Sequence, residues 1–361
     1  METDHMPETA YCIKIAKANG EKALTLVKQL AMLNTLLEIQ KDDDFIYIPL
    51  LRQPEGKELE TLKVATLGFQ IITRTFTEKN MQRKTLVQAL QKTLPSHLLA
   101  KVPRALDIIG DIAIVEIPAE LEAHEALIGE AILAVHKNVH TVLAKASAIS
   151  GTYRLREFRI IAGEPRTTTV HKEYGCKYHV DIAKAYFSPR LSREHHRVAS
   201  LVKKNEVVID LFAGVGPFSV LIAKNNCDVK VYAVDINPEA VEFLKRNISL
   251  NRVESRVIPI FGDARKVVEE RLTGVADRVI MNLPEKAIEY VDAACKSLKP
   301  EGGIVHFYSF VSRANSIEDL KQLVSDAVAA VGRKVDDFLF AWAVRETAPY
   351  EQQIVLDVKI L

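Results

Sequence analysis

The chain has 361 residues, of which 48% are hydrophobic, so it is long enough and apolar enough to form two or three globular domains. Its net charge of +1 does not by itself suggest a nucleic-acid partner, and no apolar run approaches the roughly 18 residues that a membrane span needs. Residues 1–5 lack the basic and apolar regions of a signal peptide, so we expect a cytoplasmic protein with no membrane partner.

Four cysteines lie far apart in the sequence, at Cys12, Cys176, Cys227 and Cys295. They show neither C-x-x-C spacing nor a cluster of nearby histidines, so buried free thiols are expected in place of disulfides or metal ligands. The sequence predicts no protein-bound metal.

Residues 1–80 are predicted to form a small α+β domain. Its expected elements are a strand, a helix, two extended segments and a stretch of short β-branched segments: Tyr11–Ile15, Glu21–Leu33, Leu36–Ile39, Phe45–Pro49 and Thr61–Asn80.

Residues 81–180 are predicted to form a second α+β domain. Two helices are expected, at Leu86–Thr93 and Glu120–Val135. The expected strands are Leu106–Ile109, Ile112–Ile117, Val142–Ala146, Tyr153–Ile161, Thr167–Glu173 and Lys177–Val180.

From residue 181 to 361 strands alternate with helical patterns, which is typical of a doubly wound parallel sheet. The expected strands are Val207–Asp210, Lys230–Val234, Val257–Phe261, Arg278–Asn282 and Gly303–Phe307. Two extended runs, Lys334–Ala343 and Gln353–Val358, follow one another at the end of the chain and predict antiparallel edge strands.

The segment Glu206–Ser219 carries the clearest functional pattern. Its β-branched run ends in Asp210, Gly214 and Gly216 permit a tight turn, and Pro217 suits the first turn of a helix. The next strand ends in Asp235, nineteen residues beyond Gly216, where a carboxylate can accept hydrogen bonds from both hydroxyls of a ribose. This pattern predicts a site for a nucleotide-like ligand.

A dinucleotide is the competing ligand, because an acidic residue also follows the glycines of NAD sites at about this distance. Against it, Ser219 stands where G-x-G-x-x-G has its third glycine, and Asp210, Asp235 and Asp263 close three successive strands. These carboxylates suit adenosine that carries a cationic amino-acid sulfonium. The pattern resembles the class I S-adenosylmethionine-dependent methyltransferases, although glycines that only make turns would leave the same pattern.

The turn Asn282-Leu283-Pro284-Glu285 follows the fourth strand, where enzymes of this class present the atom to be methylated. A side-chain amide stiffened by a proline can bind the edge of a planar base. No cysteine lies in this turn, which disfavours covalent cysteine chemistry. The alternative is a plain turn between a strand and a helix.

The residues 151–205 carry twelve Lys or Arg and five Asp or Glu, an excess of seven positive charges just before the glycine loop. Such a local excess can attract phosphates, or it can be an ordinary solvated surface.

The segment Tyr186–His195, together with the glycine loop and Asn282-Leu283-Pro284, resembles the archaeal and eukaryotic tRNA (guanine-N1)-methyltransferases that act on guanosine 37 beside the anticodon. The resemblance is specific over Thr152–Phe307 and weaker over the first 80 residues. It implies S-adenosylmethionine as cofactor and tRNA as partner, and we expect a monomer. For residues 1–80 it implies recognition of the outer corner of the tRNA.

The resemblance also implies roles for individual residues. Glu194 would be the general base, Arg154 would bind the O6 edge of guanine, and Asn282 and Pro284 would form the walls of the base pocket. This agrees with the chemistry, since guanine N1 must lose a proton and charge builds on O6. The cofactor would contact Tyr186, Asp210, Phe212, Gly214, Gly216, Asp235, Ile236, Asp263, Ala264 and Asn282.

Three alternatives stay open from the sequence. A wyosine-pathway transferase with this fold moves the aminocarboxypropyl group of the same cofactor onto guanosine 37. Some archaeal members also methylate carbon 7 of a tricyclic wyosine intermediate. The chain could also be an RNA-binding module with a vestigial cofactor fold, although the three intact strand-end carboxylates disfavour that reading.

Overall fold

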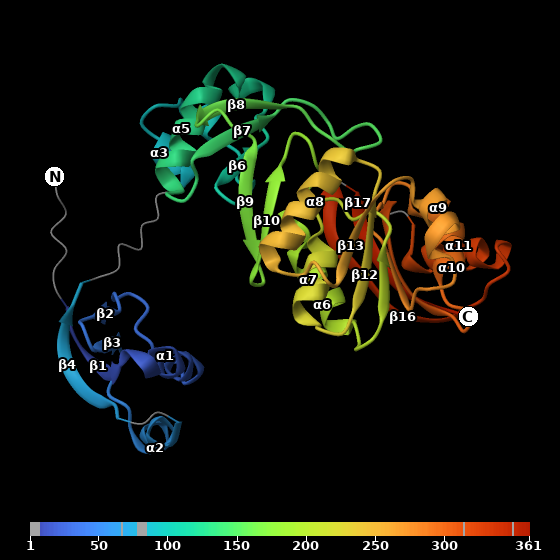
Figure 1. Cartoon of the computed structure of the whole chain (residues 1–361). Coiled ribbons are helices and arrows are strands. Elements are labelled where there is room, and N and C mark those ends of the chain that lie inside the picture. The colour runs from blue at the N-terminus through green and yellow to red at the C-terminus, as the bar shows by residue number, and fades with distance from the viewer. Residues whose placement is uncertain (1–7, 66–67, 78–84, 313–314, 349) are drawn as a thin grey trace. The chain divides into compact units, whose positions relative to one another are not determined.

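The computed structural model describes residues 8–65, 68–77, 85–312, 315–348 and 350–361. Contacts divide the chain into two compact units, Met1–Thr85 and Leu86–Leu361. Figure 1 labels their elements.

The first unit contains an antiparallel sheet with the strand order β2-β3-β1-β4. Its core contains Ile13 and Ile15 of β1, Val27 of α1 and Ile48 of β3. The elements are β1 (Glu8–Ala16), α1 (Gly20–Gln29), β2 (Gln40–Lys41), β3 (Phe45–Pro49), α2 (Gly56–Ala65) and β4 (Gln70–Phe76).

Three predictions for this unit were wrong in detail. The helix predicted to reach Leu33 ends at Gln29, because Ala31 adopts a φ of 53° that no α-helix continues. The segment 36–39 is not a strand. The segment 61–80 begins inside α2, since Lys, Glu and Leu around Thr61 favour a helix, and only β4 is extended. Residues 78–80 of that prediction lie outside the described residues.

The second unit begins with a four-stranded sheet of order β5-β6-β7-β8. One of its faces packs on α5 through Ala113 and Val142, while the opposite face, with Ile112 and Leu143, joins the core of the rest of the unit. The elements are α3 (Leu86–Leu90), α4 (Ser96–Leu99), β5 (Leu106–Ile109), β6 (Ile112–Val115), α5 (Glu125–Val135), β7 (Thr141–Lys145) and β8 (Phe158–Gly163). Because both faces are buried, this sheet is not a separate unit.

Two predicted segments here need correction. The helix predicted from Glu120 starts with a 3-10 segment, Ala119–His124, and becomes α-helical only at Glu125. The strand predicted from Tyr153 starts at Phe158. Arg154 instead has a φ of 54° and closes a turn in which its N–H donates to the Gly151 carbonyl over 3.1 Å, so Arg154 lies on a loop.

The largest sheet has the strand order β13-β12-β11-β14-β15-β17-β16. The first five strands in this order are parallel, β17 is antiparallel to β15, and β16 is antiparallel to β17. Its strands are β11 (Val207–Asp210), β12 (Lys230–Asp235), β13 (Val257–Phe261), β14 (Arg278–Met281), β15 (Gly303–Ser312), β16 (Val335–Ala348) and β17 (Glu351–Ile360). This confirms the predicted doubly wound fold with antiparallel strands at its end.

Helices cover both faces of this sheet, with α6, α7 and α8 on one side and α9, α10 and α11 on the other (Figure 1). They are α6 (Ser192–Leu201), α7 (Pro217–Asn225), α8 (Pro238–Asn251), α9 (Ala264–Val267), α10 (Val291–Ser297) and α11 (Ile317–Ala330). The strand order reverses between β11 and β14, and ligands of such sheets bind at that point, beyond the carboxyl ends of the strands.

A hairpin of β9 (Thr168–Glu173) and β10 (Cys176–Asp181) docks onto α8 through two buried asparagines. Asn247 accepts a hydrogen bond from the His179 N–H (2.7 Å) and donates to the carbonyls of His179 (3.1 Å) and Val215 (2.9 Å). Asn251 makes the same pair of contacts with Lys177, at 2.9 and 2.7 Å. The main chain of β10 is thus bonded to side chains of a helix.

Asn247→Ala should therefore lower the free energy of unfolding of the second unit by about 2–4 kcal/mol. The substitution removes the side-chain partner of the His179 N–H and of the His179 and Val215 carbonyls. Urea unfolding followed by circular dichroism would measure this change. Glu242→Ala, at an exposed position of the same helix, should stay within about 0.5 kcal/mol of wild type. Equal stabilities of the two variants would contradict the docking role of Asn247.

Candidate active site

The loop after β11 has the tight turn that its glycines predict. Gly214 has a φ of 55° and Gly216 a φ of 91°, and α7 begins at Pro217. A Cβ atom on Gly216 would lie 2.5 Å from Cδ1 of Leu244. Gly216 therefore shapes the loop by letting α8 approach it closely.

A cavity of about 130 Å³ lies at the carboxyl ends of β11, β12, β13 and β14. It brings together most of the residues predicted to contact a cofactor, namely Tyr186, Phe212, Gly214, Asp235, Ile236, Asp263, Ala264 and Asn282, and it adds Arg154. The predicted residues Asp210, Gly216, Pro284 and Glu194 do not belong to its lining.

Asp235 is held in place by the main chain around it. Its Oδ2 accepts the Gly214 N–H over 2.6 Å, and its Oδ1 accepts the Asn237 N–H over 2.8 Å. Burial raises the pKa of Asp235 above its usual value, although these backbone hydrogen bonds act in the opposite direction. A carboxylate has about four acceptor positions, more than its backbone hydrogen bonds use here, so Asp235 can still accept from a diol.

Asp210 lies fully buried beneath the loop. Its Oδ2 accepts the Ser219 hydroxyl over 2.8 Å, while Oδ1 has no hydrogen-bond partner among the described residues. Burial raises the pKa of Asp210 to about 7, against the lowering effect of Ser219. A carboxylate left this poorly compensated would be stabilised by a cationic group bound nearby.

An aromatic pair lines the cavity. Phe212 packs edge-on against Tyr290 with ring centroids 5.0 Å apart, and Ile236, which directly follows β12, is 39% exposed. These apolar surfaces suit a planar base. Tyr290 was not predicted from the sequence, since no pattern in its own segment marks it.

A second cavity, of about 480 Å³, adjoins the first. Arg154, Tyr186 and Glu285 line both cavities and form their junction. The Arg154 guanidinium lies over the Tyr186 ring at 4.7 Å, and its Nη2 lies 3.4 Å from Oε1 of Glu285. Its Nε is buried and has no partner in the described part of the chain, so this group can still donate to a ligand.

The turn after β14 is anchored to the two strands that follow in the sheet. The Asn282 Oδ1 accepts from Nε2 of Gln353 over 3.2 Å, and the Pro284 carbonyl accepts the Phe310 N–H over 3.1 Å. Phe310 lines the second cavity, and it was missed because β15 was predicted to end at Phe307.

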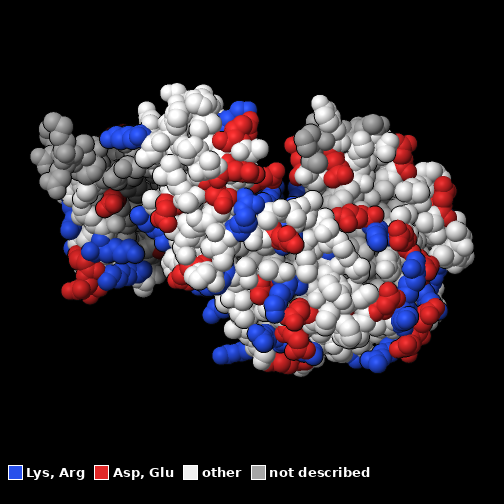
Figure 2. Space-filling view, turned by 90° about the horizontal axis from the view of Figure 1, so that it is seen from above, with Lys and Arg blue, Asp and Glu red and all other residues white. Residues whose placement is uncertain are grey.

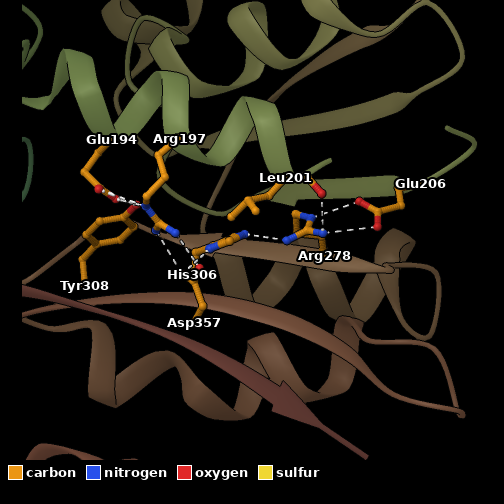
Figure 3. A network of polar contacts seen from close by, with 8 residues as sticks. All are labelled: Glu194, Arg197, Leu201, Glu206, Arg278, His306, Tyr308 and Asp357. Carbon is orange, nitrogen blue, oxygen red and sulfur yellow. Dashed lines mark hydrogen bonds and ion pairs between the residues drawn. The ribbon is translucent and has the colours of Figure 1, made fainter. Parts of the chain in front are cut away.

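Glu194 lies elsewhere, in a buried polar network (Figure 3). Its Oε1 accepts from Arg197 Nε over 3.0 Å, and its Oε2 accepts from the Tyr308 hydroxyl over 2.9 Å. Glu194 lines neither of the two cavities. The resemblance implied that Glu194 is the general base. In the structure, both of its carboxylate oxygens accept hydrogen bonds from protein groups, namely Arg197 and Tyr308.

The network continues from Arg197 to Asp357, His306 and Arg278 (Figure 3). Arg278 Nη1 lies 2.8 Å from Nε2 of His306, and Nδ1 of His306 lies 2.6 Å from Asp357. A guanidinium only donates, so Nε2 accepts and the ring proton is on Nδ1, where it donates to Asp357. Burial lowers the pKa of His306, which favours this neutral form.

The basic segment 151–205 is largely neutralised by acidic residues from elsewhere in the chain. Its ion pairs are Arg154–Glu285, Arg159–Glu125, Arg166–Asp111, Lys184–Glu239, Arg190–Asp107, Arg197–Asp357 and Lys204–Asp228. Figure 2 shows Lys and Arg side chains interspersed with Asp and Glu side chains over the face in view. The local excess read from the sequence therefore overstates the positive field.

Within the described ranges, no helix is both long and apolar enough to cross a membrane. The same residues contain no group of three or more His, Cys, Asp or Glu side chains arranged to hold a metal ion.

Family models match three consecutive parts of the chain. They describe a tRNA methyltransferase 5 N-terminal domain (residues 12–58), a TYW2 N-terminal domain (residues 86–167) and a TRM5/TYW2 methyltransferase domain (residues 169–335).

Two relatives are similar over most of their length. The tRNA (guanine(37)-N(1))-methyltransferase Trm5b of Pyrococcus abyssi is 36% identical over 96% of this chain and 98% of its own. Its crystal structure matches with a TM-score of 0.70 over 97% of this chain and 99% of that one. The tRNA 4-demethylwyosine(37)-methyltransferase Taw21 of Saccharolobus solfataricus is 35% identical over 76% of this chain and 99% of its own.

A solved complex of aTrm5 with tRNALeu is also similar, with 33% identity and a TM-score of 0.68 over 97% of this chain and 99% of that chain. Together with the layout of the strand-end cavity, these matches show that the chain belongs to the TRM5/TYW2 family of class I methyltransferases.

Proposed function

We propose that this protein transfers the methyl group of S-adenosylmethionine to N1 of guanosine 37 in tRNA. The observation that carries the proposal is the junction at which Arg154, Tyr186 and Glu285 line both the strand-end cavity and the larger cavity beside it. A group held in the first cavity can meet a base held in the second. The near full-length similarity to Trm5b supports guanosine 37 as the target.

The residues of the strand-end cavity fit S-adenosylmethionine. Asp235 can still accept from the ribose hydroxyls, Phe212 and Ile236 offer apolar surface to the adenine, and the cavity reaches Tyr186 at the end proposed for the methionine part. The buried Asp210, with its unpartnered oxygen, provides compensation for a positive charge. When bound, the cofactor supplies an electrophilic methyl group.

The larger cavity would take the flipped base. Arg154 would donate to O6 through its free N–H groups and stabilise the charge that builds there as N1 reacts. The anchored turn with Asn282 and Pro284 would form a wall of this pocket, with the amide of Asn282 held by Gln353.

Glu194 remains the proposed general base. Its carboxylate is acceptor-only when ionised and can take the N1 proton, after which the ring nitrogen is free to attack. The Tyr308 hydroxyl and Arg197 donate to the Glu194 oxygens. When tRNA is bound, Glu194 would have to give up the Tyr308 hydrogen bond and accept one from guanine N1–H in its place. Arg197 would stay in place and orient the carboxylate.

The extent of the similarity favours N1 methylation over the alternatives. Trm5b aligns with 96% of the chain and Taw21 with 76%, and the tRNA methyltransferase 5 N-terminal domain matches residues 12–58. We assign tRNA recognition to residues 1–80, RNA binding to 81–180 and catalysis to 181–361. A monomer and a cytoplasmic location stay predictions.

Nucleoside mass spectrometry of unmodified tRNA after incubation with protein and methyl-labelled S-adenosylmethionine tests the proposal. We expect labelled 1-methylguanosine at position 37. Asp235→Ala should reduce its formation by weakening cofactor binding, because the ribose hydroxyls lose a charged acceptor worth about 1.5–3 kcal/mol. Guanosine that carries an aminocarboxypropyl group, or the absence of any product, would refute N1 methylation.

The Glu194→Gln variant should slow single-turnover methyl transfer by about 10²–10⁴, because the amide cannot accept the N1 proton. Glu206→Gln is the matched control, since Glu206 lies at the far end of the same buried network, where it pairs with Arg278. Rapid-quench kinetics at saturating protein would measure both rates. A Glu194→Gln rate close to wild type, or losses that are equal in the two variants, would remove Glu194 as the base.

Binding of the cationic cofactor should release a proton from Asp210. With a pKa of about 7, roughly half of these carboxyls are protonated at pH 7, and a nearby positive charge favours ionisation. Affinity should therefore weaken as the pH falls below 7. Calorimetry in two buffers of different ionisation enthalpy measures the release, which Asp210→Asn should abolish. An unchanged release in Asp210→Asn would show that the proton comes from elsewhere.

A further inference from the structure

Glu285 lies at the junction of the two cavities. Its side chain is 48% exposed, and it lines both the strand-end cavity and the larger cavity. Only Arg154 and Tyr186 share this position among the lining residues of the two cavities. A base that receives a methyl group from one cavity while it is held in the other must present its reacting edge to these three residues.

The surroundings of Glu285 restrict its position. Pro284, immediately before it, is buried, and its carbonyl accepts the N–H of Phe310, which ties the turn to β15. On the other side, Arg154 stacks over Tyr186 and keeps Nη2 at 3.4 Å from the Glu285 carboxylate. The junction therefore presents an acceptor and a donor side by side.

This pair matches one purine edge. Guanine presents an acceptor at O6 next to donors at N1–H and at the 2-amino group, whereas adenine presents an amino donor next to an unprotonated N1. An arginine only donates and an ionised carboxylate only accepts. Guanine satisfies both side chains, while adenine would place its amino donor against Arg154 and only the C2–H group against Glu285, which disfavours its binding.

We propose that Glu285 determines the specificity for guanine by accepting a hydrogen bond from the 2-amino group, while Arg154 donates to O6 and the N1 proton between them is left to Glu194. This inference rests on the proposed function and adds a recognition residue to it. Glu194 does not provide this contact in the structure, because it lines neither cavity and its oxygens are bonded to Arg197 and Tyr308.

The test uses two substrates, tRNA with guanosine at position 37 and the same tRNA with inosine there, which lacks only the 2-amino group. For each protein variant, the single-turnover kcat/KM on the two tRNAs gives a guanosine-to-inosine ratio. We expect wild type to prefer guanosine by about 10-fold to 100-fold, the range for loss of one hydrogen bond to a charged group. Glu285→Ala should bring the ratio close to one by losing activity mainly on guanosine, and Glu285→Gln, which keeps the volume, should give an intermediate ratio.

Two other carboxylates serve as controls. Glu346 lines only the larger of the two cavities, and Glu346→Ala should keep the wild-type ratio. Glu194→Gln should slow the reaction on both tRNAs alike and also keep the ratio.

A wild-type ratio in Glu285→Ala would overturn the proposal. If the Kd for S-adenosylmethionine also rose in this variant, Glu285 would serve the cofactor and not the base. Either result leaves the proposed function intact as long as wild type methylates guanosine 37. Failure of wild type to methylate guanosine 37 would instead refute the proposed function itself.

Discussion

Pairing of buried charges fixes how α6 and three strands of the largest sheet meet. Arg278 is 2% exposed, Asp357 3% and Glu194 6%, and an unpaired ion at such a depth costs several kcal/mol. These side chains come from β14, β17 and α6, with His306 of β15 between them. The four elements must therefore keep their relative positions, because a shift of one element would leave a buried charge on another without its partner. Hydrogen bonds from His306 and Arg197 outweigh the effect of burial and bring the pKa of Asp357 to about 2, so the centre of the network stays ionised at any physiological pH.

The parts of the site that could be predicted are those encoded by one short segment. A strand, a glycine turn and a helix start are local features, and the carboxyl ends of parallel strands meet at one edge by geometry. Asp235 and Asp263 could therefore be placed together from sequence alone, as could Asn282. The helix α2 and the turn at Arg154 were missed for the converse reason, since a few β-branched residues in each segment suggested a strand that the tertiary structure does not form.

Contacts between distant segments could not be predicted. The pairing of Arg154 with Glu285 joins residues 131 positions apart, and no periodicity in either segment indicates it. The same holds for the basic stretch before the glycine loop. Its charge could be counted from the sequence, but Glu125, Asp107 and Asp357, which neutralise part of it, reach it only through the fold. Glu194 is a further example, because neither its identity nor its neighbours in sequence indicate that the Tyr308 hydroxyl donates to its carboxylate.

The docking of the β9–β10 hairpin has a consequence for how this protein can evolve. On the hairpin, Asn247 and Asn251 bond to main-chain atoms of His179 and Lys177, and every residue except proline offers the same atoms. The side chain at position 177 can change without loss of these hydrogen bonds, and at position 179 a change removes only the edge-on packing of the His179 ring on Phe243 of α8, whereas neither asparagine has an equivalent substitute. The two sides of these hydrogen bonds are therefore unequally constrained, because a substitution of either asparagine removes them while most substitutions on the hairpin side keep them.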